Sequence, residues 1–194
     1  MLAVLAGLAV GRRRGGRLVN LTRLAPRWLP LLMLAVAAVT AARVAVVPVA
    51  AARVLVIGGY VLALVGLAAN MALPWLWLAF AGAALNTAVI AANAGRMPVS
   101  GPVIRAISRS LVVGGATGPF YVLAGPHTAL APLGDTLPLV VGGVGVVLSP
   151  GDALLALGIA AVLQAGMLPG RASPAPEARD LRRGNGDRPG PGVR

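Results

Sequence analysis

Four polar side chains in and beside the segment 93–151 are of the types needed for binding or for acid–base chemistry. They are Asn93, Arg96, Asp135 and Asp152. Two carboxylates beside an arginine and an amide can bind a polar headgroup or a cation, and a carboxyl group can transfer a proton as a general acid or base. Asp135 and Asp152 are the only acidic residues before the C-terminal tail, so carboxylate chemistry in this part of the chain depends on them.

The same residues also have a structural interpretation, which we favour. Asn93 suits the C-terminal end of a helix, and Asp152 suits a capping box at the start of another. Arg96 and Asp135 can form an ion pair that holds the loop region down. We therefore assign no residue a catalytic role.

The sequence lacks residues and motifs that several classes of chemistry require. The chain has no cysteine, which excludes disulfides, thiolate metal ligands and cysteine nucleophiles. His127 is the only histidine, and we expect a solvated loop residue rather than a metal ligand. The sequence has no Gly-rich phosphate loop followed by lysine, no H-E-x-x-H and no G-x-S-x-G motif. We predict no metal and no cofactor.

The composition indicates the environment in which these side chains must be positioned. Of the 194 residues, 58% are hydrophobic and 11% are charged, and the mean hydropathy is +0.85. Water-soluble domains are about 45–50% apolar and about 25% charged. The numbers predict a protein that lies in a lipid bilayer.

The apolar stretches predict an all-α polytopic membrane protein with about four full transmembrane helices. A helix that crosses the bilayer needs about 20 apolar residues. The predicted spans are a short N-terminal membrane helix at 2–11 and full helices at 28–47, 54–73, 75–92 and 152–168. We expect Arg43 near the far end of its span with its side chain extending to the interface, although a functional intramembrane arginine is the alternative. Pro48 and Arg53 are expected to close the turn before the next span.

An irregular loop region, 93–151, separates the last two full spans. Within it, the residues 103–113 favour a short helix, and 139–148 favour two short extended runs around a turn at Gly142-Gly143. The membrane domain thus covers 1–168, and the Arg-, Pro- and Gly-rich segment 169–194 is expected to be a disordered tail.

The distribution of charge predicts the orientation of this domain. The net charge is +12, and all 17 basic residues are arginine. Twelve of them lie in the segment 11–27 and in the C-terminal tail, which the predicted spans place on the same side. The positive-inside rule makes that side cytoplasmic and the region 93–151 extracytoplasmic. The charge therefore needs no nucleic-acid partner to explain it.

Three short elements in this order resemble those of a known family. They read Asn93-Ala94-Gly95-Arg96-Met97-Pro98-Val99-Ser100, Leu133-Gly134-Asp135-Thr136-Leu137-Pro138 and Ser149-Pro150-Gly151-Asp152. They resemble the N-x-G-R-M-P-V-S, L-G-D-x-x-P and S-x-G-D elements of a family of small uncharacterised bacterial integral membrane proteins, a domain of unknown function. The resemblance covers residues 1–168 and implies a membrane location but no reaction. It singles out Asn93, Gly95, Arg96, Met97, Pro98, Gly134, Asp135, Pro138, Ser149, Gly151 and Asp152.

Two functional hypotheses follow from these observations. The first, which we favour, is a non-catalytic bacterial membrane protein with a structural, docking or lipid-contacting role. The alternative is a small membrane-embedded enzyme or lipid-handling protein that uses Asp135, Asp152 and Arg96 at the membrane surface. Membrane lipids are the expected partners in both cases, and the Gly-rich helices also permit a homo-oligomer.

The orientation can be tested with single cysteines, because the natural chain has none. We expect Ser100→Cys, in the predicted outer region, to react with a membrane-impermeant maleimide in intact cells. Ser173→Cys, in the predicted inner tail, should react only after the cells are permeabilised. The reverse pattern would invert the predicted topology.

Overall fold

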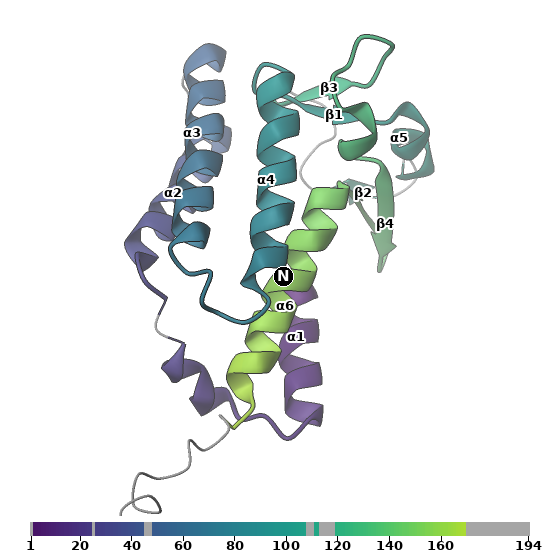
Figure 1. The fold of residues 1–194 in the computed structure, drawn as a ribbon. Coiled ribbons are helices and arrows are strands. Elements are labelled where there is room, and N and C mark those ends of the chain that lie inside the picture. Colours follow the sequence, from purple (N-terminus) through teal and green to yellow (C-terminus); the bar gives the residue numbers. More distant parts are fainter. Residues whose placement is uncertain (1, 25, 45–47, 108–110, 113–118, 170–194) are drawn as a thin grey trace, which may run out of the picture.

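The structure, a computed structural model, describes residues 2–24, 26–44, 48–107, 111–112 and 119–169. Five longer helices form a bundle in this described part: α1 (Leu2–Arg13), α2 (Leu29–Val44), α3 (Val49–Ala68), α4 (Leu76–Ala92) and α6 (Pro150–Met167). Helix α2 packs on α3, α3 on α4, α4 on α6 and α6 on α1 (Figure 1). A short 3-10 helix, η1 (Leu18–Arg23), follows α1 and packs against α6.

Two of these helices, α3 and α6, are long and apolar enough to cross a membrane. Helices α2 and α4 are also apolar but shorter, at 16 and 17 residues. The boundaries of α1, α2, α4 and α6 lie within three residues of the predicted spans. Residues 45–47 of one predicted span and the predicted tail from residue 170 onward lie outside the described residues.

The boundaries of α3 differ from the prediction of 54–73. The helix begins directly after Pro48, so Arg53 lies inside it rather than in the preceding turn. The Nε and Nη2 groups of Arg53 donate to the carbonyl of Pro119 at 3.4 and 3.3 Å. An arginine in this position is compatible with a helix end because its long side chain reaches the neighbouring loop.

The opposite end of α3 is fixed by Asn70, which is 5% exposed. Its side-chain amide donates to the carbonyls of Gly66 and Arg27 at 2.7 Å each, and its Oδ1 accepts from the backbone N–H of Arg27 at 2.6 Å. These bonds satisfy backbone groups that the helix end and the preceding loop would otherwise leave unpaired. They explain why α3 ends before the predicted residue 73.

Glycine makes the closest helix contacts of the bundle possible. A Cβ atom on Gly158 of α6 would lie 2.8 Å from the Cα of Ala79 and would also contact its backbone nitrogen. A Cβ on Gly82 of α4 would lie 2.5 Å from the nitrogen of Leu155. Because these neighbours are backbone atoms, they cannot rotate away as a side chain would. Small residues at helix contacts are typical of packing in membranes.

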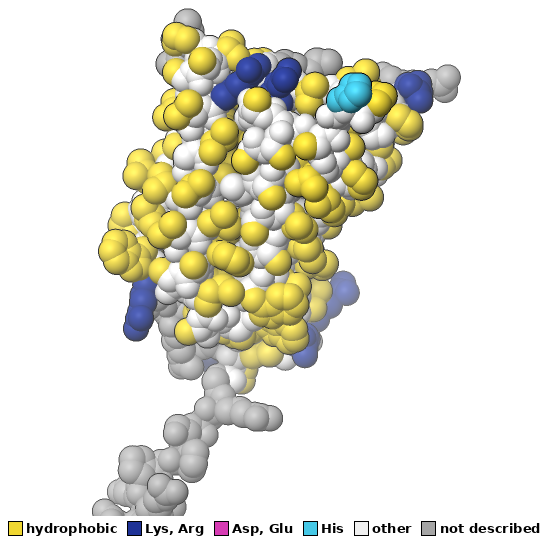
Figure 2. All heavy atoms as spheres, turned by 45° about the horizontal axis from the view of Figure 1, so that its top comes forward, with side chains coloured by type: hydrophobic (Ala, Val, Ile, Leu, Met, Phe, Trp, Pro, Cys, Tyr) yellow, Lys and Arg dark blue, Asp and Glu magenta, His cyan; other side chains and the backbone are white. Residues whose placement is uncertain are grey.

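Large apolar side chains cover the outside of the bundle. Val36, Val54 and Met33 are 66–69% exposed. Figure 2 shows hydrophobic side chains over the length of the helices and arginines toward their two ends. Soluble monomers seldom expose so many large apolar side chains along neighbouring helices.

The described residues of the region 93–151 form strands and short helices, which corrects the prediction of an irregular loop region and of an all-α fold. Strand β1 (Met97–Val99) pairs in parallel with β3 (Tyr121–Leu123). Strand β5 (Val144–Leu148) pairs with β4 (Leu137–Val141) and with β2 (Leu111–Val112). A short helix α5 (Gly101–Ile107) and a 3-10 turn η2 (Ala131–Leu133) lie between these strands. The parallel pairs join segments that are distant in sequence, so local patterns could not predict them.

The hairpin within this region was predicted from the sequence. The short helix expected over 103–113 is described only as α5, and residues 111–112 form strand β2 instead. Gly142 and Gly143 have φ values of +58° and +80°, and they connect the antiparallel strands β4 and β5 as expected of a Gly-Gly turn. All the strands of this region lie at one end of the bundle, beside the start of α6 and the end of α4 (Figure 1).

The importance of the α4–α6 contact can be tested with two alanine substitutions. Gly158→Ala should destabilise the protein by about 1–3 kcal/mol, because the added methyl group meets the backbone of Ala79. Gly58→Ala in α3 is the matched control, since a Cβ there has no neighbour within 4 Å. We expect a lower midpoint of thermal unfolding in detergent for Gly158→Ala alone. Equal midpoints would contradict the packing described here.

Candidate functional site

A cavity of about 280 Å³ lies where the bundle meets the β strands. Its lining comes from α2, α3, α4, α6, β1, β3, β5 and the segments between them. The residues are Arg43, Val56, Tyr60, Asn86, Ile90, Gly95, Met97, Phe120, Tyr121, Asp135, Val147, Leu148 and Asp152. The structure therefore brings Asp135 and Asp152 together in one cavity, as the sequence motifs suggested.

Asp152 has a structural role that agrees with the predicted capping box. Its Oδ2 accepts from the backbone N–H of Ser149 at 3.0 Å, and its own N–H donates to Ser149 Oγ at 2.9 Å. Its Oδ1 accepts from Asn86 Nδ2 at 2.7 Å, and Ser149 Oγ donates to Asn86 Oδ1 at 2.8 Å. Both carboxylate oxygens of Asp152 are thus occupied. The amide of Asn86 joins the middle of α4 to the start of α6.

Asp135 is held in a different way. Its backbone N–H donates to the carbonyl of Pro98 at 2.8 Å, and its carbonyl accepts from the N–H of Ser100 at 3.1 Å. The preceding Gly134 permits this approach, because a Cβ there would lie 2.5 Å from the Pro98 carbonyl. These contacts attach the residue to the edge of β1 by its backbone alone.

The carboxylate of Asp135 makes no hydrogen bond with the described residues. The residue is 6% exposed, and none of the hydrogen bonds or ion pairs among the described residues involves its carboxylate. Burial, and to a smaller extent the negative charge of Asp152, raise the pKa of Asp135 to about 7 against the opposing effect of Arg43. A buried carboxylate is costly when it is ionised, so this group is the clearest candidate for contact with a ligand.

The predicted ion pair between Arg96 and Asp135 is not present among the described residues. Arg96 lies outside the cavity lining, and its Nε is buried without a hydrogen-bond partner in the described part of the chain. Asn93 ends α4 as predicted: its side-chain amide donates to the carbonyls of Val89 and Ala129 at 2.8 and 2.9 Å.

The remaining motif residues position the cavity or lie outside it. Gly95 and Met97 line it, and Pro98 is fully buried in β1. Gly151 lies against the side chain of Asn86, where a Cβ would collide with the amide oxygen. Pro138 is exposed on β4 and does not line the cavity. His127 is exposed in a loop, as predicted (Figure 2).

The arginine and the tyrosines that line the cavity were not predicted as site residues. Arg43 was expected at the end of its helix with its side chain extending to the interface; it is exposed there, and it also lines the cavity. Tyr60 and Tyr121 are the only tyrosines of the chain, and both line the cavity beside Phe120. The rarity of aromatic residues, 4% of the chain, was the signal that could have identified them.

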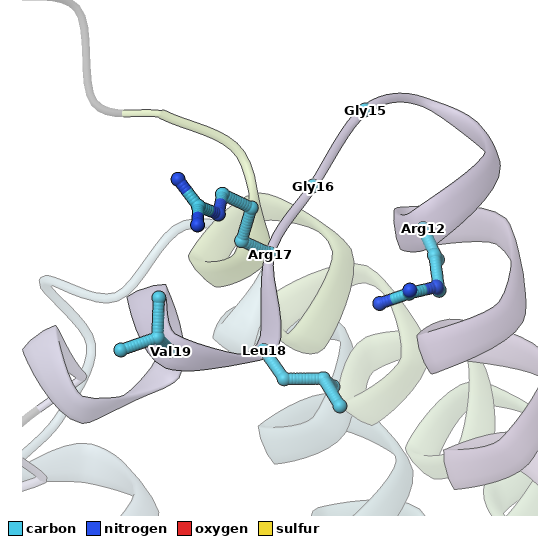
Figure 3. A pocket seen from close by; sticks show the side chains of 6 residues that line it. All are labelled: Arg12, Gly15, Gly16, Arg17, Leu18 and Val19. Carbon is cyan, nitrogen blue, oxygen red and sulfur yellow. The ribbon is translucent and has the colours of Figure 1, made fainter.

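A second hollow, of about 540 Å³, lies at the opposite end of the bundle. It is lined by Arg12, Gly15, Gly16, Arg17, Leu18 and Val19. Figure 3 shows the side chains of Arg12 and Arg17 pointing in different directions from the two sides of the glycine turn. The two guanidinium groups do not converge on one position, so we do not treat this hollow as a site. Among the described residues no group of three or more acidic or histidine side chains could hold a metal ion.

Comparison with known proteins places the chain in a family. A model described as "Family of unknown function (DUF5317)" matches residues 19–164, about three quarters of the chain. The chain belongs to this family. Every residue that lines the cavity lies within the matched range, so the cavity is built entirely from the family domain. Searches of curated proteins and of solved structures found no match.

The raised pKa of Asp135 predicts a pH-dependent stability. Between about pH 4 and pH 7 the folded protein keeps a proton that the unfolded chain releases, so stability should fall as the pH rises through this range. Each unit by which the pKa differs between the folded and unfolded states changes the free energy of unfolding by about 1.4 kcal/mol. Asp135→Asn should remove most of this slope in thermal unfolding at pH 4–8, and His127→Gln should keep it. An unchanged slope in Asp135→Asn would show that the carboxyl group is not the cause.

Proposed function

We propose that the protein is a multi-pass integral membrane protein that binds a small cationic group in the cavity beside Asp135, without altering it chemically. In this proposal α2, α3, α4 and α6 cross the bilayer, and α1 packs beside the C-terminal half of α6. The support for a membrane location is the apolar outer surface and the two helices of sufficient length. Trp28, Trp75 and Trp77 are 53–67% exposed near one end of the bundle, where interfacial aromatic residues are expected.

The proposed orientation follows from the arginines. The segment 11–27 and the end of α6 lie at one end of the bundle, and the cavity lies at the other (Figure 1). Six of the arginines belong to 11–27 and six to the C-terminal tail. The positive-inside rule then gives the cavity an extracytoplasmic location.

The single observation that carries the ligand proposal is Asp135, a mostly buried residue of the cavity lining whose carboxylate makes no hydrogen bond with the described residues. Asp152 cannot serve a ligand in the same way without losing bonds that hold α6, because both its oxygens accept hydrogen bonds. A cation that enters the cavity would pair with Asp135 and would reduce the repulsion between the two acids. The rings of Tyr60, Phe120 and Tyr121 add faces that attract a cation.

An acid–base enzyme is the second candidate. The observation that favours it is the pKa of Asp135, about 7, which suits proton transfer near neutral pH. The described lining offers no serine, cysteine, lysine or histidine as a nucleophile or second base. Ser149 is fully buried and bonded to Asn86 and Asp152. Binding therefore accounts for more of the arrangement than catalysis does.

The binding proposal is tested by thermal unfolding of the purified protein at pH 8, where Asp135 is ionised. Ethanolamine should raise the midpoint by a few degrees, since a ligand at ten times its Kd adds about 1.4 kcal/mol. Sodium acetate at the same ionic strength should have no such effect. Asp135→Asn should weaken the response to ethanolamine at least tenfold, and His127→Gln should leave it unchanged. No response of the wild-type protein to ethanolamine would overturn the cation site.

A further inference from the structure

An apolar groove of about 310 Å³ runs along the contact between α2 and α3. Its lining includes Leu32, Val36, Val39, Thr40, Ala63 and Leu67. The groove exists because small residues occupy its floor: Ala35, Gly59 and Ala63 all line it. Val36 is 67% exposed, so the groove opens to the outside of the bundle.

The groove and the polar cavity meet at Tyr60, which lines both. On α2 the lining positions Leu32, Val36 and Thr40 are spaced four residues apart, and Arg43 of the cavity continues the same face. On α3 the groove residue Ala63 lies one turn from Tyr60, and the cavity residue Val56 lies one turn further on. An apolar path of about 12 Å, measured from Leu32 to Thr40 along the helix, thus leads to a polar end.

The cavity has an acidic and a basic side chain, which suits a ligand that carries both a positive and a negative charge. Asp135 and the aromatic rings offer a place for an ammonium group. Arg43 is exposed in the last turn of α2 and makes no hydrogen bond or ion pair with the described residues. A free guanidinium beside the cavity suits a phosphate, which it can bind through two parallel hydrogen bonds.

We infer that the cavity and the groove together bind one aminophospholipid, with its ammonium group beside Asp135, its phosphate on Arg43 and one acyl chain in the α2–α3 groove. The inference rests on the proposed cation site and adds the class of ligand. A free amine would use the cavity but would leave the apolar groove, which shares Tyr60 with it, without an occupant. The lipid would occupy both the cavity and the groove, with its polar headgroup in the polar cavity and its acyl chain in the apolar groove.

The test compares lipid retention with amine binding in the same purified protein. Native mass spectrometry should show phosphatidylethanolamine retained at least tenfold better than phosphatidylglycerol. Ala63→Phe places a ring in the groove and should reduce retention of phosphatidylethanolamine at least tenfold, while ethanolamine still raises the unfolding midpoint. Val61→Phe is the matched control on α3, since Val61 is 47% exposed and lies outside the groove lining, and it should keep both properties.

A second variant keeps the inference testable if Ala63→Phe does not fold. Arg43→Gln removes the proposed phosphate contact, so it should retain phosphatidylethanolamine at least tenfold less well than the wild type does. Two results would overturn the lipid inference alone, provided that the wild type binds ethanolamine. One is equal retention of both lipids by the wild type. The other is unchanged retention of phosphatidylethanolamine in both Ala63→Phe and Arg43→Gln. No ethanolamine response in the wild type would overturn the cation site and the lipid inference together.

Discussion

The amide of Asn86 connects the two parts of the structure. It lies in the middle of α4, is 2% exposed, and bonds both to the side chain of Ser149 and to that of Asp152 at the start of α6. A buried amide is stable there only because each of its groups has a partner. The bond network requires α4 and α6 to be in close contact, and glycines such as Gly82 and Gly151 permit that contact. The position of β5, which leads directly into Ser149, depends on the same network.

The network also explains why the two acids have different roles. Asp152 is fully bonded and maintains the start of α6, so its charge is compensated by donors. Asp135 is placed by backbone bonds to Pro98 and Ser100, which fix its position without satisfying its carboxylate. A folded protein tolerates such a group when the surrounding contacts determine its position. Stability is then lower than it could be, as is common at sites that bind ligands.

The polar cavity lies at one end of a bundle whose outer surface is otherwise apolar. Its polar groups come from both the helices and the strands, so neither part could form it alone. The family to which the chain belongs has no known function, so the binding properties of the cavity follow only from its side chains. The side chains that contribute most are an acid that makes no hydrogen bond with the described residues, an arginine at the mouth and three aromatic rings.

The sequence alone determined the features that depend on composition and on neighbouring residues. These are the apolar helices, the capping box at Ser149 and Asp152, the Gly142–Gly143 turn and the end of α4 at Asn93. Each is set by contacts within a few residues, so local patterns predict it. The early start of α3 was missed because a charged residue, Arg53, was assigned to a turn.

Only the tertiary structure decided how the cavity is assembled. The parallel pairing of β1 with β3 and the joining of Asp135 to Pro98 link residues far apart in the chain. The same long-range packing placed Arg43, Tyr60 and Tyr121 beside the acids and left Arg96 outside. Such contacts depend on the whole chain packing together, so no local pattern of residues could have specified them.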